Sequence, residues 1–404
     1  MKAPANPLNN QSSERASASA VGRAFQRTYG SPARVYRAPG RVNLIGEHTD
    51  YNLGFVMPVA INLYCWVALT PRPDRQLHVR STNFETSVSV DLDNPNLTSR
   101  GDWSDYVVGT AIALEHHGYK IPGANVLVSG LVPMGSGLSS SAAIEVSTGY
   151  ALLDVNNVSI DRTQLALACR QAENEFVGAH VGIMDQFICS HGRAGHALML
   201  DCRSLDAQFL PVSADVKLVV CNTGVRHQHA GGEYNVRRAQ CEEGVRLLSS
   251  AIPGTQSLRD VDPAQLEQHK HRMPELIYRR CRHVVTENER VQRAAEALLQ
   301  GDLALLGTLM AESHRSMRDD YEISCSELDT MVEIASVQPG IIGARMTGGG
   351  FGGCTINLVR SDAADAFKQS VSMEFQNRTN IHPDIYVLSA SEGVLEVTLD
   401  TLVA

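Results

Sequence analysis

Hydrophobic residues follow two different spacings along this 404-residue chain. A continuous apolar run from Leu63 to Leu69 is typical of a strand that is buried on both faces. Between Phe84 and Leu92 most alternate positions are apolar, which predicts a half-exposed strand. Residues 161–176 instead carry apolar side chains at helical spacing, which predicts an amphipathic helix.

The order of the elements predicts an α+β protein with two domains. In the first half, strands are expected within 36–70 and 124–129, and helices over 21–29, 104–118 and 161–176. The second half is helix-rich, with strands within 216–220, 341–359 and 385–389 and helices over 276–300, 303–318, 324–337 and 362–377. Strands followed by mixed helices are typical of α+β or two-domain α/β proteins. We expect a disordered tail over 1–20, an N-terminal domain over 21–213 and a C-terminal domain over 214–404.

Composition and charge narrow the class of protein. The chain is 43% hydrophobic and 20% charged, as in folded globular proteins, and its net charge is −9. No cluster of five consecutive basic residues occurs, so we expect no nucleic-acid partner. There is no run of eighteen apolar residues and no apolar leader segment, so we expect no membrane span. The nine cysteines form no CxxC pair, which predicts free thiols in the cytoplasm, and we expect a monomer.

A glycine- and serine-rich segment, Pro133–Ala142, precedes a predicted helix. Its glycines permit a tight turn and a close approach of the backbone to a ligand. The N–H groups at a helix N-terminus bind phosphate, and a serine hydroxyl can ligate Mg²⁺. The segment is neither a Walker A loop, since it lacks the lysine, nor a Rossmann fingerprint. On these residues alone, a plain turn with serine caps is an equal alternative.

Two further segments carry candidate chemistry. Polar side chains crowd the segment Ala38–Tyr51, among them Arg41 and Asp50, and would suit a polyol ligand, although a solvated turn with one salt bridge is the alternative. The segment Arg345–Cys354 has five glycines within six residues, which indicates a backbone that approaches another group closely or has positive φ angles. A flexible linker is the alternative there, but apolar runs lie on both sides.

Together, these three segments resemble the three motifs of the GHMP kinase superfamily. Pro133–Ala142, PMGSGLSSSA, is similar to the nucleotide motif P-x-G-x-G-L-x-S-S-A, and the glycine cluster is similar to the C-terminal motif. Gly40–Tyr51, GRVNLIGEHTDY, resembles the signature of the galactokinase family. The similarity extends over about residues 22–395. It implies a two-domain fold with a ribosomal-S5-like N-terminal core that has a left-handed crossover, a ferredoxin-like C-terminal domain, and an active site between them.

The resemblance also implies an activity, namely ATP-dependent phosphorylation of the anomeric 1-hydroxyl of galactose, the first committed step of galactose catabolism. Its substrates are galactose and ATP, with Mg²⁺ as the metal ion. It assigns Asp185 as the base and Arg41 as its partner. The sugar contacts it implies are Glu47, His48, Thr49, Asp50, Gly182 and Tyr234. The nucleotide contacts are Gly135, Ser136, Gly137, Leu138, Ser139, Ser140 and Ser141, and the metal ligands are Ser141 and Glu173.

Two other functions remain open at this point. A kinase for a related sugar, such as N-acetylgalactosamine, differs in the space around the 2-position of the sugar, which the sequence shows poorly. A catalytically silent sugar and nucleotide sensor is the other alternative. Such relatives lose residues from the serine and alanine run, whereas Ser139–Ala142, Asp185 and Arg41 are all present here. These residues favour an active enzyme.

Overall fold

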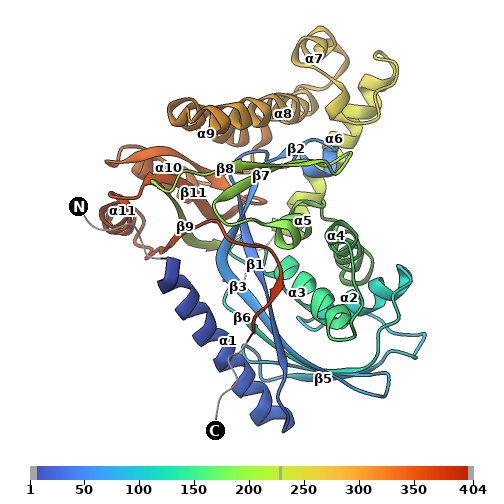
Figure 1. The fold of residues 1–404 in the computed structure, drawn as a ribbon. Helices are drawn as coiled ribbons and strands as arrows, with labels where there is room; N and C mark the ends of the chain where they lie inside the picture. Colours follow the sequence, from blue (N-terminus) through green and yellow to red (C-terminus); the bar gives the residue numbers. More distant parts are fainter. Residues whose placement is uncertain (1–6, 134, 227–229, 399–404) are drawn as a thin grey trace.

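A six-stranded sheet is the centre of the larger half of the protein (Figure 1). The structure is a computed structural model that describes residues 7–133, 135–226 and 230–398. The strand order of the sheet is β13-β1-β3-β6-β4-β5, in which β4 and β6 are parallel and all other neighbours are antiparallel. The strands are β1 (Arg34–Asn43), β3 (Pro58–Pro71), β4 (Gln76–Ser81), β5 (Ser87–Asp91), β6 (Ala124–Gly130) and β13 (Leu395–Glu396). The long strands β1 and β3 run from this sheet towards the other half (Figure 1).

The apolar run in β3 is buried on both faces, as predicted. Cys65, Val67 and Leu69 belong to the main core, while Trp66 and Ala68 belong to a separate cluster on the opposite face. The main core is covered by four helices, of which α3 packs directly on β1 and β3. These helices are α2 (Asp105–His116), α3 (Ser140–Asp154), α4 (Arg162–Gln171) and α5 (Met184–His191).

The opposite face of the sheet is covered by α1 (Pro7–Tyr29). The prediction of a disordered tail over 1–20 is therefore wrong for residues 7–20, and residues 1–6 lie outside the described part of the chain. The fully buried Phe25 anchors the helix on the sheet, and Glu14 forms an ion pair with the buried Arg37. The local sequence has weak helical patterning, so tertiary packing is what stabilises this helix.

A four-stranded antiparallel sheet forms the second half, in the order β10-β11-β9-β12. Its strands are β9 (Val216–Arg226), β10 (Ile341–Thr347), β11 (Gly352–Arg360) and β12 (Asp384–Leu388). The helices of this half are α6 (Ala230–Ser249), α7 (Pro263–Gln268), α8 (Glu275–Gln300), α9 (Leu303–Ser316), α10 (Ser326–Ser336) and α11 (Ala364–Thr379). Helices α10 and α11 pack against the sheet, and α9 packs on β10 and α8.

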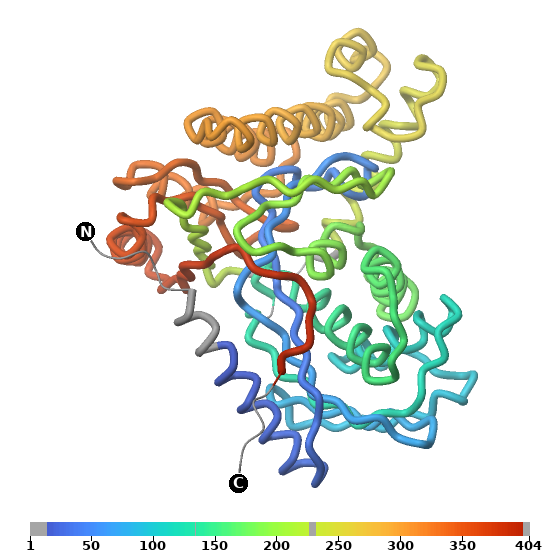
Figure 2. Tube along the Cα trace, in the orientation of Figure 1, coloured from blue at the N-terminus to red at the C-terminus, as the bar shows by residue number. Residues whose placement is uncertain are grey.

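Two structural features connect the halves. A small sheet of β2 (Phe55–Val56), β7 (His196–Asp201) and β8 (Ala207–Pro211) contacts α8, so first-half residues meet a second-half helix. The end of the chain also returns to the first sheet, where β13 pairs with β1 (Figure 2). The expected C-terminal domain over 214–404 therefore needs correction, because its last strand belongs to the larger sheet.

The predicted helix over 161–176 is also modified in the structure. α4 ends at Gln171, and the chain continues as a π-helical turn over Ala172–Val177. A π turn widens the helix and is frequent at functional sites. The expected strand between Phe84 and Leu92 is shorter than predicted, because β5 covers only Ser87–Asp91.

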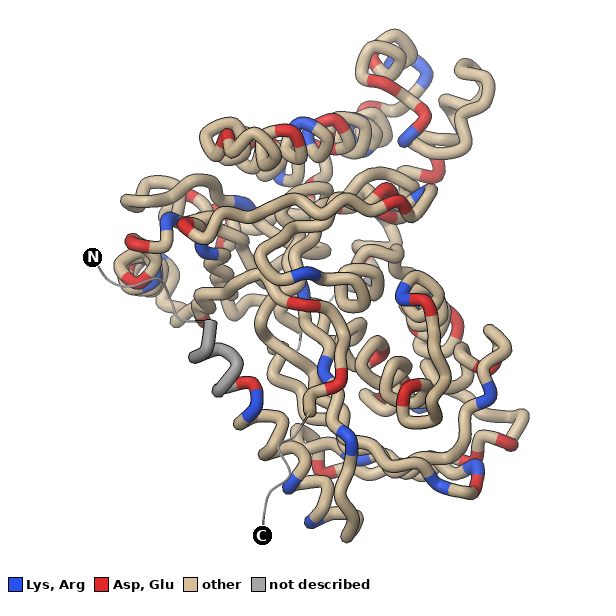
Figure 3. Tube along the Cα trace, in the orientation of Figure 1, with Lys and Arg blue, Asp and Glu red and all other residues tan. Residues whose placement is uncertain are grey.

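Acidic and basic residues are interspersed in both halves of the protein (Figure 3). In the described ranges, every helix is too short or too polar to cross a membrane.

Phe25→Ala is expected to lower the free energy of unfolding by about 3–5 kcal/mol, because it leaves a cavity between α1 and the sheet. Urea denaturation measures this change. The matched control is Met373→Ala on α11, where the side chain is 63% exposed; it should change stability by less than about 0.5 kcal/mol. Equal midpoints for Phe25→Ala and the unaltered protein would contradict the docked helix.

Candidate active site

The ion pair between Arg41 and Asp185 lies at the centre of the site. Arg41 lies near the end of β1, and Asp185 lies in the first turn of α5. The guanidinium Nε donates to Asp185 Oδ1 at 2.8 Å and Nη2 donates to Oδ2 at 2.7 Å. Such a two-point pair fixes orientation as well as distance. Two residues that are 144 positions apart therefore form one rigid unit.

The glycine- and serine-rich loop contacts this pair directly. Arg41 Nη1 donates to the carbonyl of Gly137, and the Ser139 hydroxyl donates to Asp185 Oδ2. Gly40 makes the approach possible, because a Cβ there would lie 2.6 Å from the carbonyl oxygen of Leu138. The same carbonyl accepts the backbone N–H of Arg41 at 3.1 Å. The loop, β1 and α5 are thus joined around a single guanidinium.

The loop brings the start of α3 to the carboxylate. Gly135 and Gly137 have positive φ angles of 63° and 78°, and Ser139 has a φ of 60°, in the left-handed region. Because the Ser139 hydroxyl bonds to Asp185, it does not cap α3, which begins at Ser140. The first N–H groups of a helix have no acceptor within it and can bind an anion.

Two of the predicted nucleotide residues serve the loop itself. The Ser136 side chain is buried, and its hydroxyl donates to the carbonyl of Pro133 at 2.7 Å. The Leu138 side chain is buried in the main core. Only their backbone groups are therefore placed to meet a ligand, whereas Ser140 and Ser141 are partly exposed at the helix start.

The C-terminal glycine cluster packs behind the same loop. A Cβ at Gly353 would lie 3.3 Å from the carbonyl oxygen of Ser136, and one at Gly350 would lie 2.4 Å from that of Ile323. Gly348, Gly350, Gly352 and Gly353 all have positive φ angles. The prediction of close backbone approach is confirmed, and the flexible-linker alternative is wrong, because this segment packs tightly between β10 and β11.

Glu47 connects the charged loop to the glycine cluster. Its Oε1 accepts hydrogen bonds from Thr347 Oγ1 at 3.0 Å and from the Gly348 N–H at 2.8 Å, and it pairs with Arg345 Nη2 at 2.8 Å. Its Oε2 accepts from Asn43 Nδ2 at 3.1 Å. Glu47 borders the cavity described next, but both of its oxygens already have protein partners.

A cavity of about 460 Å³ opens between the two halves of the protein. Its lining brings together most of the residues implied as sugar contacts and both members of the central pair. The lining residues are Arg41, Glu47, His48, Asp50, Val181, Gly182, Met184, Asp185, Tyr234, Gly348 and Gly349. A cavity with several convergent polar groups is the usual form of a small-molecule site.

Thr49 is the one implied sugar contact that does not line this cavity. Its side chain is fully buried, and its hydroxyl lies 2.9 Å from the carbonyl oxygen of Gly46 and 2.6 Å from that of Phe55. The Thr49 side chain therefore does not face the cavity, and its expected contact with a sugar stays a prediction. Thr49 instead holds the loop that presents His48 and Asp50.

Gly182 makes room for the Asp50 carboxylate. A Cβ at Gly182 would lie 1.9 Å from Asp50 Oδ2, so any larger residue would displace the carboxylate. Burial and the nearby negative charge of Asp185 together raise the pKa of Asp50 to about 7. Asp50 is therefore a hydrogen-bond acceptor whose ionisation is costly in this cavity.

His48 and Tyr234 form an aromatic wall of the cavity, with ring centroids 5.2 Å apart. Burial lowers the pKa of His48 to about 3, so the ring is neutral near pH 7. Burial also raises the pKa of Tyr234 well above 10, which keeps its hydroxyl protonated.

Helix α8 supports the charged loop from the second half, which sequence reasoning missed. Glu287 Oε1 accepts the N–H of Gly46 at 2.9 Å, and Asn288 Oδ1 accepts the N–H of Phe55 at 2.9 Å. His283 Nε2 lies 3.1 Å from the carbonyl oxygen of Glu47. These three residues occupy one side of α8. The sequence shows the apolar periodicity of this helix, but the spacing of the three polar residues does not indicate partners that lie 233 to 241 positions away.

The residues implied as metal ligands fit Mg²⁺. Glu173 is buried in the π-helical turn and interacts with the Ser141 hydroxyl at the start of α3. Burial and the nearby negative charge of Asp185 together raise the pKa of Glu173 to about 7, so a bound cation would stabilise its ionised form. Mg²⁺ typically takes one or two protein carboxylates together with phosphate oxygens and water. Among the described residues, no group of three His, Cys, Asp or Glu side chains forms a complete metal cage.

Gln186 and Glu145 complete this acidic cluster and were not predicted. Gln186 Nε2 donates to Glu173 Oε2 at 2.6 Å and to Glu145 Oε2 at 3.0 Å. Gln186 follows Asp185 directly in the sequence, so one helical turn connects the expected base with the expected metal ligand. This adjacency to Asp185 is the only feature of the sequence that indicates a place for Gln186 in the site.

A narrow second cavity lies beside Ser140, and sequence reasoning missed its aromatic wall. The rings of Phe84 and Trp103 stack there, with centroids 5.6 Å apart and planes 6° apart. Asn83 and Ser81 supply polar groups to the same cavity. Phe84 was expected inside a strand, but it lies in the loop before β5, where its ring is free to stack.

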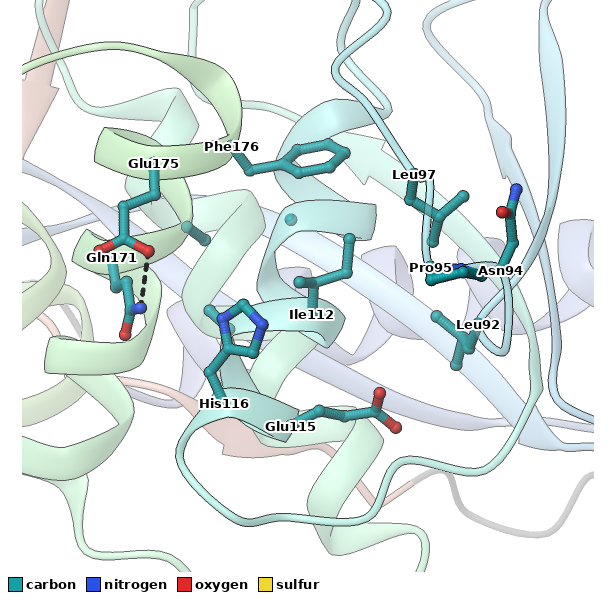
Figure 4. A pocket seen from close by; sticks show the side chains of 13 residues that line it. Leu92, Asn94, Pro95, Leu97, Ile112, Glu115, His116, Gln171, Glu175 and Phe176 are labelled. Carbon is teal, nitrogen blue, oxygen red and sulfur yellow. Dashed lines mark hydrogen bonds between the residues drawn. The ribbon is translucent and has the colours of Figure 1, made fainter.

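A larger cavity of about 920 Å³ lies elsewhere, between α2, the loop at 92–97 and the π-helical turn (Figure 4). Its walls are mainly apolar, including Leu97, Ile112 and Phe176, and Gln171 donates to Glu175 at 2.7 Å on its rim. None of the predicted site residues lines it. The cavity lined by Arg41, Asp50 and Asp185 is the better candidate site, because charged groups converge in it.

The fold and the site define a GHMP kinase. The family model "GHMP kinases N terminal domain" matches residues 105–193, "GHMP kinases C terminal" matches 294–377, and "Galactokinase galactose-binding signature" matches 23–71. A mevalonate kinase from Methanococcus jannaschii has a similar fold, with a TM-score of 0.62 at 18% identity, over 90% of this chain and 100% of that one.

Closer relatives identify the family. A galactokinase of Chloroflexus aggregans is 47% identical over 372 residues, which is 92% of this chain and 95% of that protein. One from Roseiflexus sp. is 44% identical over 371 residues, again 92% and 95% of the two chains. The solved structure of Lactococcus lactis galactokinase complexed with galactose superposes with a TM-score of 0.90 at 35% identity, covering 94% of this chain and 99% of that one. The chain belongs to the galactokinase family.

Asp50→Asn is expected to stabilise the protein at pH 8 but not at pH 4. The folded state holds a proton on Asp50 up to about pH 7, whereas an unfolded aspartate releases it near pH 4. The wild-type protein therefore loses stability as the pH rises between these values, by about 4 kcal/mol at most, and the neutral amide does not.

Urea denaturation at both pH values measures this difference. Asp362→Asn, at an exposed carboxylate, is the control and should show no such pH dependence. A stabilisation of the same size at pH 4 and pH 8 would contradict a buried ionisable Asp50.

Proposed function

We propose that this chain transfers the γ-phosphoryl group of ATP to the anomeric 1-hydroxyl of galactose, giving galactose 1-phosphate and ADP. One observation carries the proposal. The Asp185 carboxylate, which borders the same cavity as Asp50, accepts hydrogen bonds from both Arg41 and Ser139, and Ser139 directly precedes the helix that would bind phosphate. An acceptor for the sugar proton and an anion site are therefore adjacent.

Asp185 acts in this proposal as the acceptor of the hydroxyl proton. Asp185 lines the cavity together with Arg41, whose guanidinium donates to the carboxylate and stabilises its charge. A strong base is not required, because phosphoryl transfer is largely dissociative and depends on positioning and electrostatics. As the oxygen attacks the γ-phosphorus, the proton passes to Asp185 and the bond to the ADP oxygen breaks. Arg41 then stabilises negative charge on the transferring group.

The start of α3 would hold the phosphates. Backbone N–H groups near Ser140 offer donors at the positive end of the helix dipole. Ser141 and Glu173 would hold Mg²⁺, which when bound supplies positive charge to the phosphoryl oxygens. Gln186 keeps the Glu173 carboxylate oriented through its 2.6 Å hydrogen bond.

Sugar recognition would rest on Asp50, His48 and Tyr234 around the cavity. Asp50 can accept hydrogen bonds from two hydroxyls, and a sugar epimer that misplaced one of them would leave the carboxylate unpaired. The relative from Lactococcus lactis was solved in complex with galactose, and its fold matches this chain over 94% of its length. That similarity supports galactose as the sugar.

The aromatic cavity beside Ser140 would hold the adenine base. A flat apolar slot with amide and hydroxyl groups suits a purine, since an aromatic face stacks on the base and polar groups bind its edge. Its closeness to the start of α3 matches the short distance between the base and the phosphates of a nucleotide.

The proposal includes a monomeric enzyme in the cytoplasm. The nine cysteines are free thiols, eight of them buried, which suits a reducing compartment. Among the described residues, the large exposed apolar side chains are spread along the chain, and Leu276 and Leu299, which share α8, lie at opposite ends of that helix. Scattered residues of this kind are normal on a monomer.

Measurement of ADP release from the purified chain with a panel of sugars tests the proposal. Galactose should give the highest kcat/KM, well above glucose and N-acetylgalactosamine, with mevalonate and homoserine inactive. Preference for N-acetylgalactosamine would identify a kinase for that sugar instead. Tight binding of galactose and ATP without turnover would identify a silent sensor.

Asp185→Asn should lower kcat by at least roughly 100-fold, because general-base catalysis typically contributes that much. Steady-state kinetics with a coupled ADP assay measure the loss, and the circular dichroism spectrum reports whether the fold survives. Asp154→Asn is a matched control. Asp154 also pairs with an arginine, Arg34, but it does not line the cavity. Turnover of the Asp185 variant near the wild-type value would contradict its role.

Trp103→Ala should raise the KM for ATP about tenfold, since stacking on an aromatic ring is worth about 1–3 kcal/mol per base. The KM for galactose should stay unchanged. Trp103→Phe keeps an aromatic face and should behave almost like the wild-type enzyme. An unchanged KM for ATP in the alanine variant would place the base elsewhere.

A further inference from the structure

A chain of buried hydrogen bonds leads from the cavity into the second half of the protein. His48 Nδ1 lies 2.7 Å from the Tyr51 hydroxyl, which lies 2.8 Å from the Tyr321 hydroxyl. The Tyr321 hydroxyl lies 3.1 Å from the Cys241 sulfur. His48 lines the cavity, whereas Tyr51, Tyr321 and Cys241 do not. These four side chains are called the His48 relay below.

The hydrogen atoms of the His48 relay can point in only one direction. His48 Nε2 lies 3.3 Å from the carbonyl oxygen of Gly349, which can only accept, so Nε2 carries a hydrogen. Since the ring is neutral, Nδ1 is bare and accepts from the Tyr51 hydroxyl. Tyr51 must then accept from Tyr321, and Tyr321 from the Cys241 thiol.

The protonation states of the relay agree with this direction. Burial raises the pKa values of Tyr51 and Tyr321 well above 10, and that of Cys241 to about 11. Two hydroxyls and one thiol therefore supply three hydrogens for three links. The reverse direction would leave two acceptors, His48 Nε2 and the Gly349 carbonyl, facing each other. A buried polar chain of this kind holds its members in place only when every link is satisfied.

We propose that Tyr51 and Tyr321 are positioning residues that hold His48 as a neutral Nε2–H donor to an oxygen of the sugar. The role of this donor rests on the proposed function, whereas the tautomer does not. The link to Gly349 is long at 3.3 Å, so Nε2–H can turn to a ligand oxygen at low cost. His48 then donates a hydrogen bond to one sugar oxygen, whereas Asp50 accepts hydrogen bonds from hydroxyl groups of the sugar. The sugar must therefore offer an acceptor to His48 and a donor to Asp50.

The tautomer of His48 in the full-length protein without ligand tests the relay. NMR spectra that correlate ring nitrogens with ring carbon-bound protons distinguish the two tautomers in ¹⁵N-histidine-labelled protein, and the His48→Gln spectrum assigns the His48 signals. We expect a hydrogen on Nε2 and none on Nδ1 near pH 7. A hydrogen on Nδ1, or a protonated ring, would overturn the proposal.

Kinetics of Tyr51→Phe test how the sugar uses this donor. Loss of the hydrogen bond to Nδ1 should remove the single tautomer and raise the KM for galactose about tenfold, with kcat and the KM for ATP changed less than about twofold. Tyr321→Phe should give a smaller rise, because Tyr51 still donates to His48. Tyr321→Phe also tests the relay if the Tyr51→Phe variant does not fold.

Tyr64→Phe is the matched control. It removes a hydroxyl that bonds to Ser391 Oγ at 2.9 Å, away from the cavity, and should change neither KM nor the His48 spectrum. An unchanged KM for galactose in both relay variants would overturn the proposal even if the tautomer is as expected. If the wild-type chain does not phosphorylate galactose, the proposed function fails, and the NMR result still decides the state of His48.

Discussion

The solvation of one buried charge organises this site. The Arg41 side chain is only 8% exposed, so its guanidinium needs protein partners. It finds them in the Asp185 carboxylate and the Gly137 carbonyl. Arg41 on its strand thereby contacts both a helix and a loop at this point. Removal of either charge would leave the other unpaired, which typically costs several kcal/mol when the group is buried.

Backbone proximity is the second constraint, and it joins the two halves of the protein. The glycine cluster approaches the loop before α3 so closely that a Cβ at Gly353 would lie 3.3 Å from the carbonyl oxygen of Ser136 and one at Gly348 would lie 3.4 Å from that of Gly137. Glu47 binds the N–H of Gly348 from the other side, and α8 holds the loop that contains Glu47. The cavity is therefore lined by both halves, although each half has its own sheet.

Negative charge exceeds positive charge around the cavity. Asp50, Glu173 and Asp185 lie near a single arginine, and burial with mutual repulsion raises the pKa values of Asp50 and Glu173 to about 7. Such an arrangement of negative charges reduces the stability of the folded protein. It suits the proposed ligands, because hydroxyl hydrogens and a divalent cation would relieve the repulsion that the fold maintains.

Much of the fold could be predicted, because the periodicity of apolar residues is a local property. The run from Leu63 to Leu69 identified a strand buried on both faces, and helical spacing identified α2, α8 and α9 to within a few residues. The first helix was missed over residues 7–20, since packing of Phe25 and pairing of Glu14 stabilise it rather than its own pattern.

The sequence by itself determined the residue types of the site: the glycines that permit close approach, the serines at a helix start, and a loop crowded with polar side chains. Only the tertiary structure decided which of them meet. It joined Arg41 to Asp185 across 144 positions, turned Thr49 away from the cavity, and stacked Phe84 on Trp103. The physical reason is that sheet pairing and core packing set distances between remote segments, whereas sequence spacing describes only the local course of the chain.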